Sequence, residues 1–174
     1  PVMSHSVSLE TSAEALIREL DLRPHPEGGF FRETFRARDL PFTLPDRGPR
    51  SASTAIYFLL QSGDFSALHR VRSDEVWHHY LGVPLELHCF EPTRGHDSLL
   101  LGTDIGAGER PQHVVRENVY QAARPARPGF TLCGCTVAPG FDFQDFEMPP
   151  RSELLALFPS FARLVTELTR AEKP

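Results

Sequence analysis

The residues most able to do chemistry in this chain gather between positions 68 and 82. His69, Glu75, His78 and His79 bring three imidazoles and one carboxylate into a stretch that otherwise has the pattern of two strands. Imidazole and carboxylate groups bind divalent metals, and they also move protons near neutral pH. The segment therefore predicts either a metal site or acid–base catalysis, with His69 and Glu75 as its principal residues.

The alternation of side chains along a β-strand decides which of these residues share a face. If Glu75 points inward, Trp77 and His79 do so as well. His78 then points outward, but a bulge beside the adjacent histidines would reverse that assignment. Either His78 or His79 can therefore face the interior. A purely structural interpretation also stands, in which the histidines are exposed and Glu75 pairs with a nearby arginine.

The surrounding sequence predicts short strands at regular spacing, with helices only near the ends of the chain. Residues 13–20 carry apolar positions at helical spacing behind an N-cap at Ser12, and residues 152–158 and 161–169 repeat the helical pattern. Residues 39–50 are predicted to form a loop. Strands are predicted at 30–35, 53–60, 67–71, 75–81, 85–90, 99–102, 112–115 and 129–137. This order is typical of a mainly β fold, a single antiparallel sandwich or barrel.

The composition limits the classes of partner. The chain has 174 residues, of which 40% are hydrophobic and 24% charged, and its formal net charge is −5. This suits one soluble globular domain, predicted over residues 12–174, behind a disordered or artificially added tail at 1–11. The negative charge disfavours nucleic-acid binding, and the basic cluster of Arg32, Arg36 and Arg38 is interpreted as solvated surface. We find neither an apolar run of membrane-spanning length nor a signal peptide, so no membrane partner is expected.

Cysteine usage points to a reducing compartment. Cys89, Cys133 and Cys135 are odd in number and contain no C-x-x-C pair. Neither a disulfide framework nor a zinc site fits that pattern. We therefore expect buried, unreactive thiols and a cytoplasmic location.

Several segments together resemble one family of cupins. The run from His69 through Glu75 to Gly82 has the Glu-x6-Gly spacing of the first cupin motif. Residues 26–34, 53–60, 73–78 and 134–143 are similar to segments of the Cupin_5 (DUF985) family and stand in the same order. The resemblance extends over residues 16–158. It implies a jelly-roll cupin barrel of two antiparallel sheets, with a small-molecule pocket and usually a homodimeric state. The biochemical function of that family is poorly defined.

The same resemblance indicates where the chain departs from a metal-binding cupin. Val71 stands where the first motif usually has its second histidine, and Gln121 replaces the histidine of the second motif, which falls on residues 117–121. A neutral amide oxygen is a poor ligand for borderline metals. The cofactor prediction is therefore open: either no metal, or a weakly bound divalent metal held by His69, Glu75 and Gln121 with water.

Further residues are predicted to contact a ligand in the barrel. They are Glu27, Gly29, Arg32, Tyr57, Trp77, His78, Gln121 and Phe141. An inward Arg32 would hold an anionic group through its guanidinium, and Gly29 would allow close backbone approach at the pocket rim. The structural alternatives are a surface ion pair for Arg32, a plain turn around Gly29 and core packing for the aromatic residues.

The leading functional hypothesis is an epimerase or isomerase that acts on a carbohydrate-like or other small polar molecule. In it, His69 is the general base, Glu75 orients His69, and Gln121 and Arg32 hold substrate oxygens. The support is a fold-level analogy with cupin sugar epimerases. Two alternatives stand beside it: a metal-dependent cupin oxygenase or isomerase, and a non-catalytic module that binds a metabolite. The predicted partners are a small molecule and a second copy of the chain.

Overall fold

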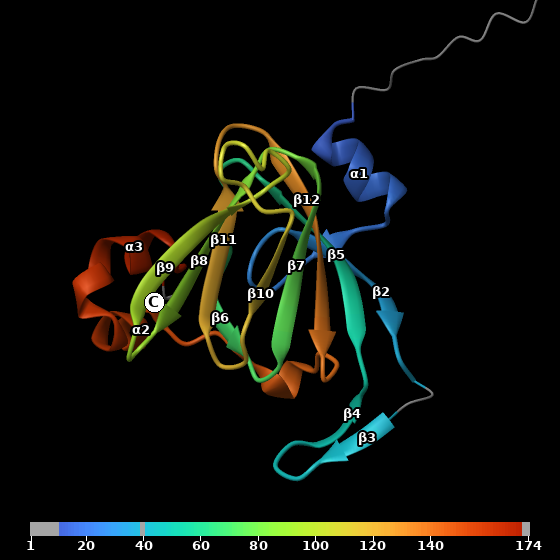
Figure 1. The fold of residues 1–174 in the computed structure, drawn as a ribbon, viewed down its shortest axis with the longest axis vertical. Coiled ribbons are helices and arrows are strands. Elements are labelled where there is room, and N and C mark those ends of the chain that lie inside the picture. Colours follow the sequence, from blue (N-terminus) through green and yellow to red (C-terminus); the bar gives the residue numbers. More distant parts are fainter. Residues whose placement is uncertain (1–10, 39–40, 172–174) are drawn as a thin grey trace, which may run out of the picture.

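Two antiparallel sheets face each other and enclose the main core, as Figure 1 shows. The computed structural model describes residues 11–38 and 41–171. The predicted tail at 1–11 lies outside the described residues except for Thr11. The mainly β fold with short helices near both ends is confirmed.

The six-stranded sheet contributes most of the strands that surround the candidate site. Its order is β1 (Arg23–Pro24), β2 (Phe30–Arg36), β5 (Thr54–Gln61), β12 (Phe130–Ala138), β7 (Asp74–Gly82) and β10 (Gln112–Val115). The five-stranded sheet has the order β13 (Phe146–Glu147), β6 (Ser66–Val71), β11 (Tyr120–Pro125), β8 (Leu85–Glu91) and β9 (Gly95–Leu101). Chain neighbours alternate between the two sheets from β5 to β8 and again from β9 to β13, which is the crossing pattern of a jelly roll.

Apolar side chains fill the space between the sheets and the outer faces that helices cover. Between the sheets lie Phe58, Trp77, Leu87 and their neighbours, all nearly inaccessible to solvent. Helix α1 (Ala13–Glu19) packs on the outer face of the six-stranded sheet. Ser12 caps this helix as predicted, because its hydroxyl accepts a hydrogen bond from the Ala15 amide at 3.1 Å.

Two C-terminal helices cover the other sheet. Helices α2 (Arg151–Leu157) and α3 (Ala162–Glu167), joined by the 3₁₀ turn η2 (Pro159–Phe161), bury Leu154 and Val165 against the five-stranded sheet. No helix in the described part of the chain is long and apolar enough to cross a membrane.

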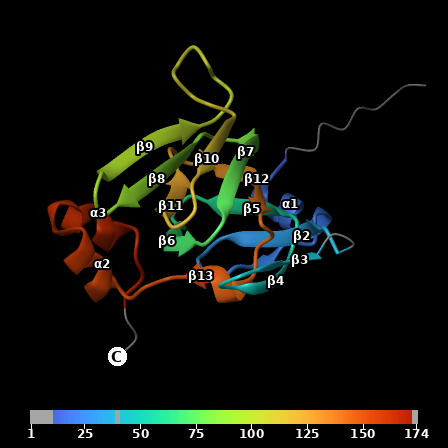
Figure 2. The same ribbon diagram turned by 60° about the horizontal axis from the view of Figure 1, so that its bottom comes forward.

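The predicted loop at residues 39–50 is wrong in part, because most of it forms a hairpin. Strands β3 (Pro41–Leu44) and β4 (Gly48–Ser51) pair antiparallel. Arg50, at the inner end of this hairpin, donates two hydrogen bonds to the buried carboxylate of Asp145, at 2.8 and 2.9 Å. This long-range ion pair ties the hairpin to the segment after β12, and no local pattern in the sequence reveals it. Figure 2 shows that segment lying beside β4.

Candidate functional site

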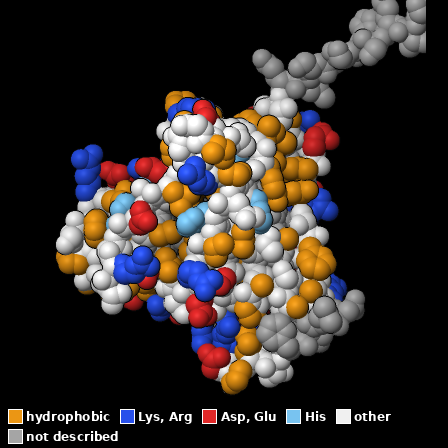
Figure 3. Space-filling view, viewed as in Figure 1, with side chains coloured by type: hydrophobic (Ala, Val, Ile, Leu, Met, Phe, Trp, Pro, Cys, Tyr) orange, Lys and Arg blue, Asp and Glu red, His pale blue; other side chains and the backbone are white. Residues whose placement is uncertain are grey.

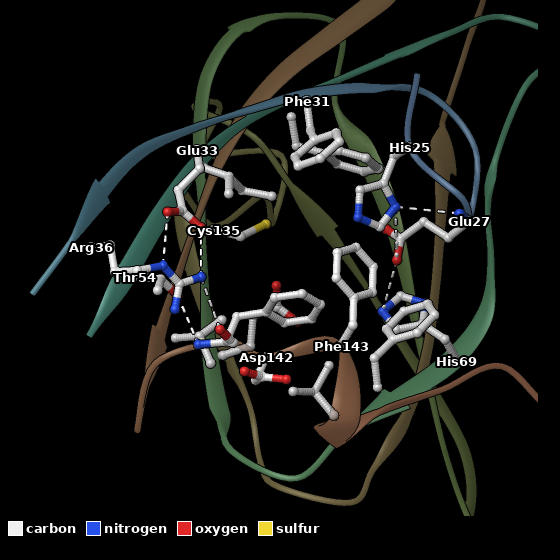
Figure 4. Close-up of a pocket in the computed structure, with 17 residues that line it drawn as sticks. His25, Glu27, Phe31, Glu33, Arg36, Thr54, His69, Cys135, Asp142 and Phe143 are labelled. Carbon is white, nitrogen blue, oxygen red and sulfur yellow. Dashed lines mark hydrogen bonds and ion pairs between the residues drawn. The ribbon is translucent and has the colours of Figure 1, made fainter. Parts of the chain in front are cut away.

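A cavity of about 240 Å³ opens at one end of the space between the sheets. Strands β2, β5, β7 and β12 form one wall, and β6 forms the other. Residues 141–146, which include the 3₁₀ turn η1 (Phe143–Asp145), cover its mouth, and we call them the covering segment. The apolar lining consists of Phe31, Ile56, Phe58, Val71, Val137, Phe141, Phe143 and Phe146. The polar lining is gathered at two opposite ends, as Figure 4 shows.

One end of the cavity holds a chain of buried ionisable groups. Glu27 Oε2 lies 3.3 Å from His69 Nε2 and 3.6 Å from His25 Nδ1. The other Glu27 oxygen accepts a hydrogen bond from the Ser66 hydroxyl at 2.9 Å. All three ionisable side chains are more than nine-tenths buried. The turn that contains His25 and Glu27 is bonded to β6, because the Glu27 carbonyl accepts a hydrogen bond from the Ala67 amide at 2.8 Å.

Hydrogen bonds define the tautomer of His69. Its Nδ1 lies 2.7 Å from the Ala67 carbonyl oxygen, which can only accept, so Nδ1 carries the ring proton. Nε2 of the neutral ring is then an acceptor facing Glu27. Burial lowers the pKa of His69 and raises the pKa of Glu27 to about 8. At neutral pH the proton therefore lies on Glu27, whose carboxyl faces the unprotonated Nε2 of His69.

The second buried carboxyl, Glu75, is held by a different set of contacts. Gln121 Nε2 donates a hydrogen bond to Glu75 Oε2, and Gln121 Oε1 accepts one from the Trp77 indole at 2.8 Å. Cys135 also hydrogen-bonds to Glu75. Burial raises the pKa of Glu75, while nearby His69 and the bond from Gln121 oppose that rise. Glu27 and Glu75 thus differ in their hydrogen-bond donors. The donors around Glu75 favour its ionised form more than the donor to Glu27 favours the ionised form of Glu27.

The opposite end of the cavity is polar because β2 contains an irregularity. Its pairing with β5 shifts between Glu33 and Phe35, so Arg36 faces the cavity together with Glu33 while Phe35 is 55% exposed. Arg36 donates to both Glu33 oxygens, at 2.9 and 2.7 Å, and to the Phe141 carbonyl at 3.1 Å. Asp142 lies at the same end. The guanidinium is therefore largely occupied by groups of the protein itself.

The structure brings only part of the predicted site together. Four of the predicted residues line the cavity: Glu27, His69, Glu75 and Phe141. Trp77 and Gln121 lie deeper in the barrel and orient Glu75 rather than reach the cavity. Gly29 belongs to the turn beside it, with φ of 69° and its amide bonded to Asp64 at 2.9 Å.

Two predicted ligand contacts, Arg32 and Tyr57, point away from the cavity. Arg32 is exposed on β2 and donates to the Leu20 carbonyl at 3.1 Å, so the expected inward guanidinium is wrong. Tyr57 alternates with the inward Ile56 and Phe58 and packs on the outer face near α1. The reason is strand parity in both cases.

The question of the adjacent histidines is resolved by the same alternation and a bulge. Glu75 and Trp77 point inward, so His78 lies on the outer face, 3.2 Å from the Thr136 hydroxyl. The pairing of β7 with β12 shifts just beyond, near His79. His79 Nε2 there contacts the Val83 carbonyl at 3.1 Å. Neither imidazole lines the cavity, which corrects the predicted ligand contact of His78.

Comparison with known proteins identifies the family. The sequence profile of Cupin_5, described as Cupin superfamily (DUF985), matches residues 14–149. The chain belongs to the Cupin_5 family. A hypothetical protein from Leishmania major superposes with a TM-score of 0.86 at 30% identity, covering 93% of this chain and 100% of that one. A protein from Shewanella oneidensis gives a TM-score of 0.85 at 36% identity, covering 93% and 99%.

Two further comparisons agree with the fold of this Cupin_5 protein but indicate no activity for it. An uncharacterized protein of Saccharomyces cerevisiae is 29% identical over 152 residues, which cover 78% of this chain and 74% of the relative. Oxalate decarboxylase from Bacillus subtilis shares the fold alone, with a TM-score of 0.53 at 14% identity over 88% of this chain and 38% of the enzyme.

The metal set predicted for this cupin does not fit the arrangement of its donors. Gln121 turns its NH₂ group toward Glu75, and its oxygen already accepts the indole proton of Trp77. Val71 contributes an apolar side chain to the cavity wall. Within residues 11–38 and 41–171, no three His, Cys, Asp or Glu side chains are placed to hold a metal ion. We therefore derive no chemical step through a metal.

His25 and Arg36 are two of the cavity residues that the sequence did not predict. His25 stands one position before the segment 26–34, which resembles the family. That position is the one feature of the sequence that could have indicated it. Arg36 was interpreted as solvated surface with Arg32 and Arg38, which the structure does leave exposed. The bulge in β2 turns Arg36 alone into the cavity, and strand alternation without that bulge would place it outside.

Proposed function

We propose that this Cupin_5 protein is an acid–base isomerase or epimerase that moves a proton within a small molecule bound in the barrel. The observation that carries this proposal is the buried group of Glu27, His69 and Glu75 at one end of a largely apolar cavity. Burial raises the pKa of both carboxyls, but Gln121 donates to Glu75 while Glu27 has only the Ser66 hydroxyl, and two carboxyls with different partners can supply an acid and a base at one pH.

The hydrogen bonds suggest a role for each group. Glu75, stabilised as a carboxylate by Gln121, removes a proton from a carbon next to a carbonyl group of the substrate, and the C–H electron pair moves toward that carbonyl oxygen. Glu27, which burial keeps protonated, returns a proton to the same carbon, and the electron pair on oxygen re-forms the carbonyl group. The proton taken by Glu75 then returns to Glu27, so no proton is lost in the cycle. His69 keeps its own ring proton on Nδ1 and lies 3.3 Å from Glu27, so it orients the acid rather than acting as the first base.

The cavity supports a small substrate with apolar surface. Its volume of about 240 Å³ lies below the roughly 300–1,000 Å³ of sites for drug-sized ligands. Five phenylalanines line it, so a flat or ring-shaped body would find aromatic faces on several sides. A carbohydrate-like ligand would have to place its less polar ring face against them.

The experiment begins with the ligand that the purified protein carries. Native mass spectrometry identifies that ligand, and NMR in D₂O then follows the loss of its C–H signals in the presence of the protein. We expect exchange with the wild type and a decrease of roughly a hundredfold or more in Glu75→Gln. His78→Ala is the matched control, because His78 lies outside the cavity.

Two results would favour the alternatives. A stoichiometric metal in protein purified without chelators, lost in His69→Ala, would indicate a metal-dependent cupin. A ligand that is recovered unchanged and exchanges no hydrogen with solvent would indicate a binding module.

A homodimer and a cytoplasmic location belong to the same proposal. Figure 3 shows hydrophobic and histidine side chains gathered on the face over β7 and β12. Tyr80, Leu81 and Val114 are 51%, 42% and 41% exposed there. Such a patch supports a contact with a second copy of the chain. The free thiols of the three cysteines support a reducing compartment. Sedimentation of the purified protein tests the dimer.

A further inference from the structure

His25 occupies the cavity wall beside the buried carboxyls. It lies in the turn between β1 and β2, and its side chain is 7% exposed. The ring packs edge-on against Phe31 at 4.5 Å and Phe58 at 6.0 Å between centroids. Figure 4 shows the imidazole pointing into the cavity, opposite the end that holds Arg36. The ring is thus fixed in direction before any ligand enters.

The backbone determines which nitrogen of His25 carries the proton. The Glu27 amide donates a hydrogen bond to His25 Nδ1 at 3.3 Å. Because an amide N–H can only donate, Nδ1 is unprotonated, and the neutral ring must carry its proton on Nε2. Burial lowers the pKa of His25 to about 4, so the ring stays neutral at physiological pH.

The Nε2–H group of His25 is available to a ligand. Within residues 11–38 and 41–171, no protein atom accepts a hydrogen bond from it. The side chain is nine-tenths buried, but this donor still opens into the cavity, where an acceptor on an entering molecule can take its hydrogen bond. The ligand therefore carries a hydrogen-bond acceptor at this position.

The charges nearby narrow the kind of acceptor. An anionic carboxylate is disfavoured there, because the Glu75 carboxylate lies at the same end and Arg36 is paired with Glu33 at the other. An ammonium group offers no lone pair to an N–H donor. A neutral carbonyl oxygen meets both conditions.

We infer that His25 binds the carbonyl oxygen of the ligand through Nε2–H and stabilises the enolate that forms when Glu75 removes the neighbouring proton. The enolate part of this inference rests on the proposed function, whereas the binding part rests on the geometry of His25. In the step, the C–H electron pair forms the carbon–carbon double bond and the carbonyl π pair moves to oxygen. The Nε2 proton stays on nitrogen and shortens its hydrogen bond to that oxygen.

The first test is spectroscopic and needs no knowledge of the natural ligand. In protein with ¹⁵N-labelled histidine, NMR reports the tautomer of each ring, and His25 is assigned by its loss in His25→Phe. We expect a neutral ring with the proton on Nε2 at pH 7. A proton on Nδ1, or a charged ring, would overturn the inference.

The second test compares three probes of one size: cyclohexanone, cyclohexanol and cyclohexylamine. We expect cyclohexanone to bind most tightly and to shift the Nε2 signal. His25→Phe keeps the ring packing without the donor, and should weaken cyclohexanone binding by about tenfold. His25→Gln, which keeps an N–H donor, should recover part of that loss. His113→Phe is the matched control, because His113 does not line this cavity.

The outcomes separate the two proposals. Tightest binding by cyclohexylamine, or equal ketone binding by wild type and His25→Phe, would overturn the role of His25 even if α-hydrogens exchange. Ketone binding through Nε2–H without exchange of the α-hydrogens into D₂O would leave the binding role standing and refute the proposed proton transfer. Absence of cyclohexanone binding up to its solubility limit would refute the carbonyl assignment.

Discussion

Replacing Glu27 by glutamine should flatten the pH dependence of stability. Glutamine keeps the size of the side chain, an acceptor for the Ser66 hydroxyl and a donor toward His69, but it cannot ionise. In the wild type, burial raises the pKa of Glu27 from 4.5 to about 8, so between those values the folded state binds more protons than the unfolded state. The stabilisation that protonated Glu27 gives the folded state is therefore fully present below pH 4.5. It is lost as the pH rises through about 8.

The size of the effect follows from the same two values. One pKa unit corresponds to about 1.4 kcal/mol. The rise from 4.5 to about 8 then amounts to roughly 5 kcal/mol of unfolding free energy, lost by the wild type and not by Glu27→Gln. A typical domain has only about 5–15 kcal/mol in total, so a difference of this order is easy to detect.

Urea unfolding from about pH 4.5 to about pH 9 measures the difference. Trp77 reports unfolding cleanly, because it is the only tryptophan in the chain and is 1% exposed. His25 also titrates in this range but with the opposite sign, since its pKa is lowered to about 4, and comparing the two proteins removes most of its contribution.

A second variant tests the cause. The bond from Ser66 lowers the pKa of Glu27, so Ser66→Ala should move the loss of stability to higher pH. Parallel pH profiles for wild type and Glu27→Gln would mean that Glu27 is already ionised in the folded protein at neutral pH. The assignment of Glu27 as the acid would then be refuted.

Three other substitutions test the supports of the site. Arg50→Ala removes both hydrogen bonds to buried Asp145 and should lower the unfolding free energy by about 3–5 kcal/mol, measured by urea unfolding; a loss below about 1 kcal/mol would show that the covering segment is held otherwise. Trp77→Phe leaves the Gln121 oxygen without its donor and should cost about 1–3 kcal/mol, read by thermal unfolding with circular dichroism; an unchanged midpoint would contradict the orienting role. Gly29→Ala places a Cβ 2.5 Å from the Leu59 carbonyl at a φ of 69° and should cost at least about 1–3 kcal/mol; wild-type stability in the same assay would contradict the strain argument.

The sequence predicted those parts of the structure that depend on regular alternation. Strand parity predicts that Glu75 and Trp77 share one face, and the structure buries both side chains. Arg36 could not be placed, because a single bulge in β2 reverses parity for the residues after it. His25 sits in a turn, where no periodic pattern says which way a side chain points. The ion pair of Arg50 with the covering segment joins positions 95 residues apart and has no local signal.

Val71 and Gln121, which stand where a metal-binding cupin has histidines, also help to explain why a carboxyl in this cavity keeps its proton. A bound cation would stabilise buried carboxylates, but Val71 offers no ligand and Gln121 offers its NH₂ group to Glu75. Without a charge to compensate them, two buried carboxyls cannot both be ionised at low cost, so one must keep its proton. Glu27, which has the weaker set of donors, is the one that does. A carboxyl that keeps its proton beside one that accepts from Gln121 is the arrangement on which the proposed proton transfer depends.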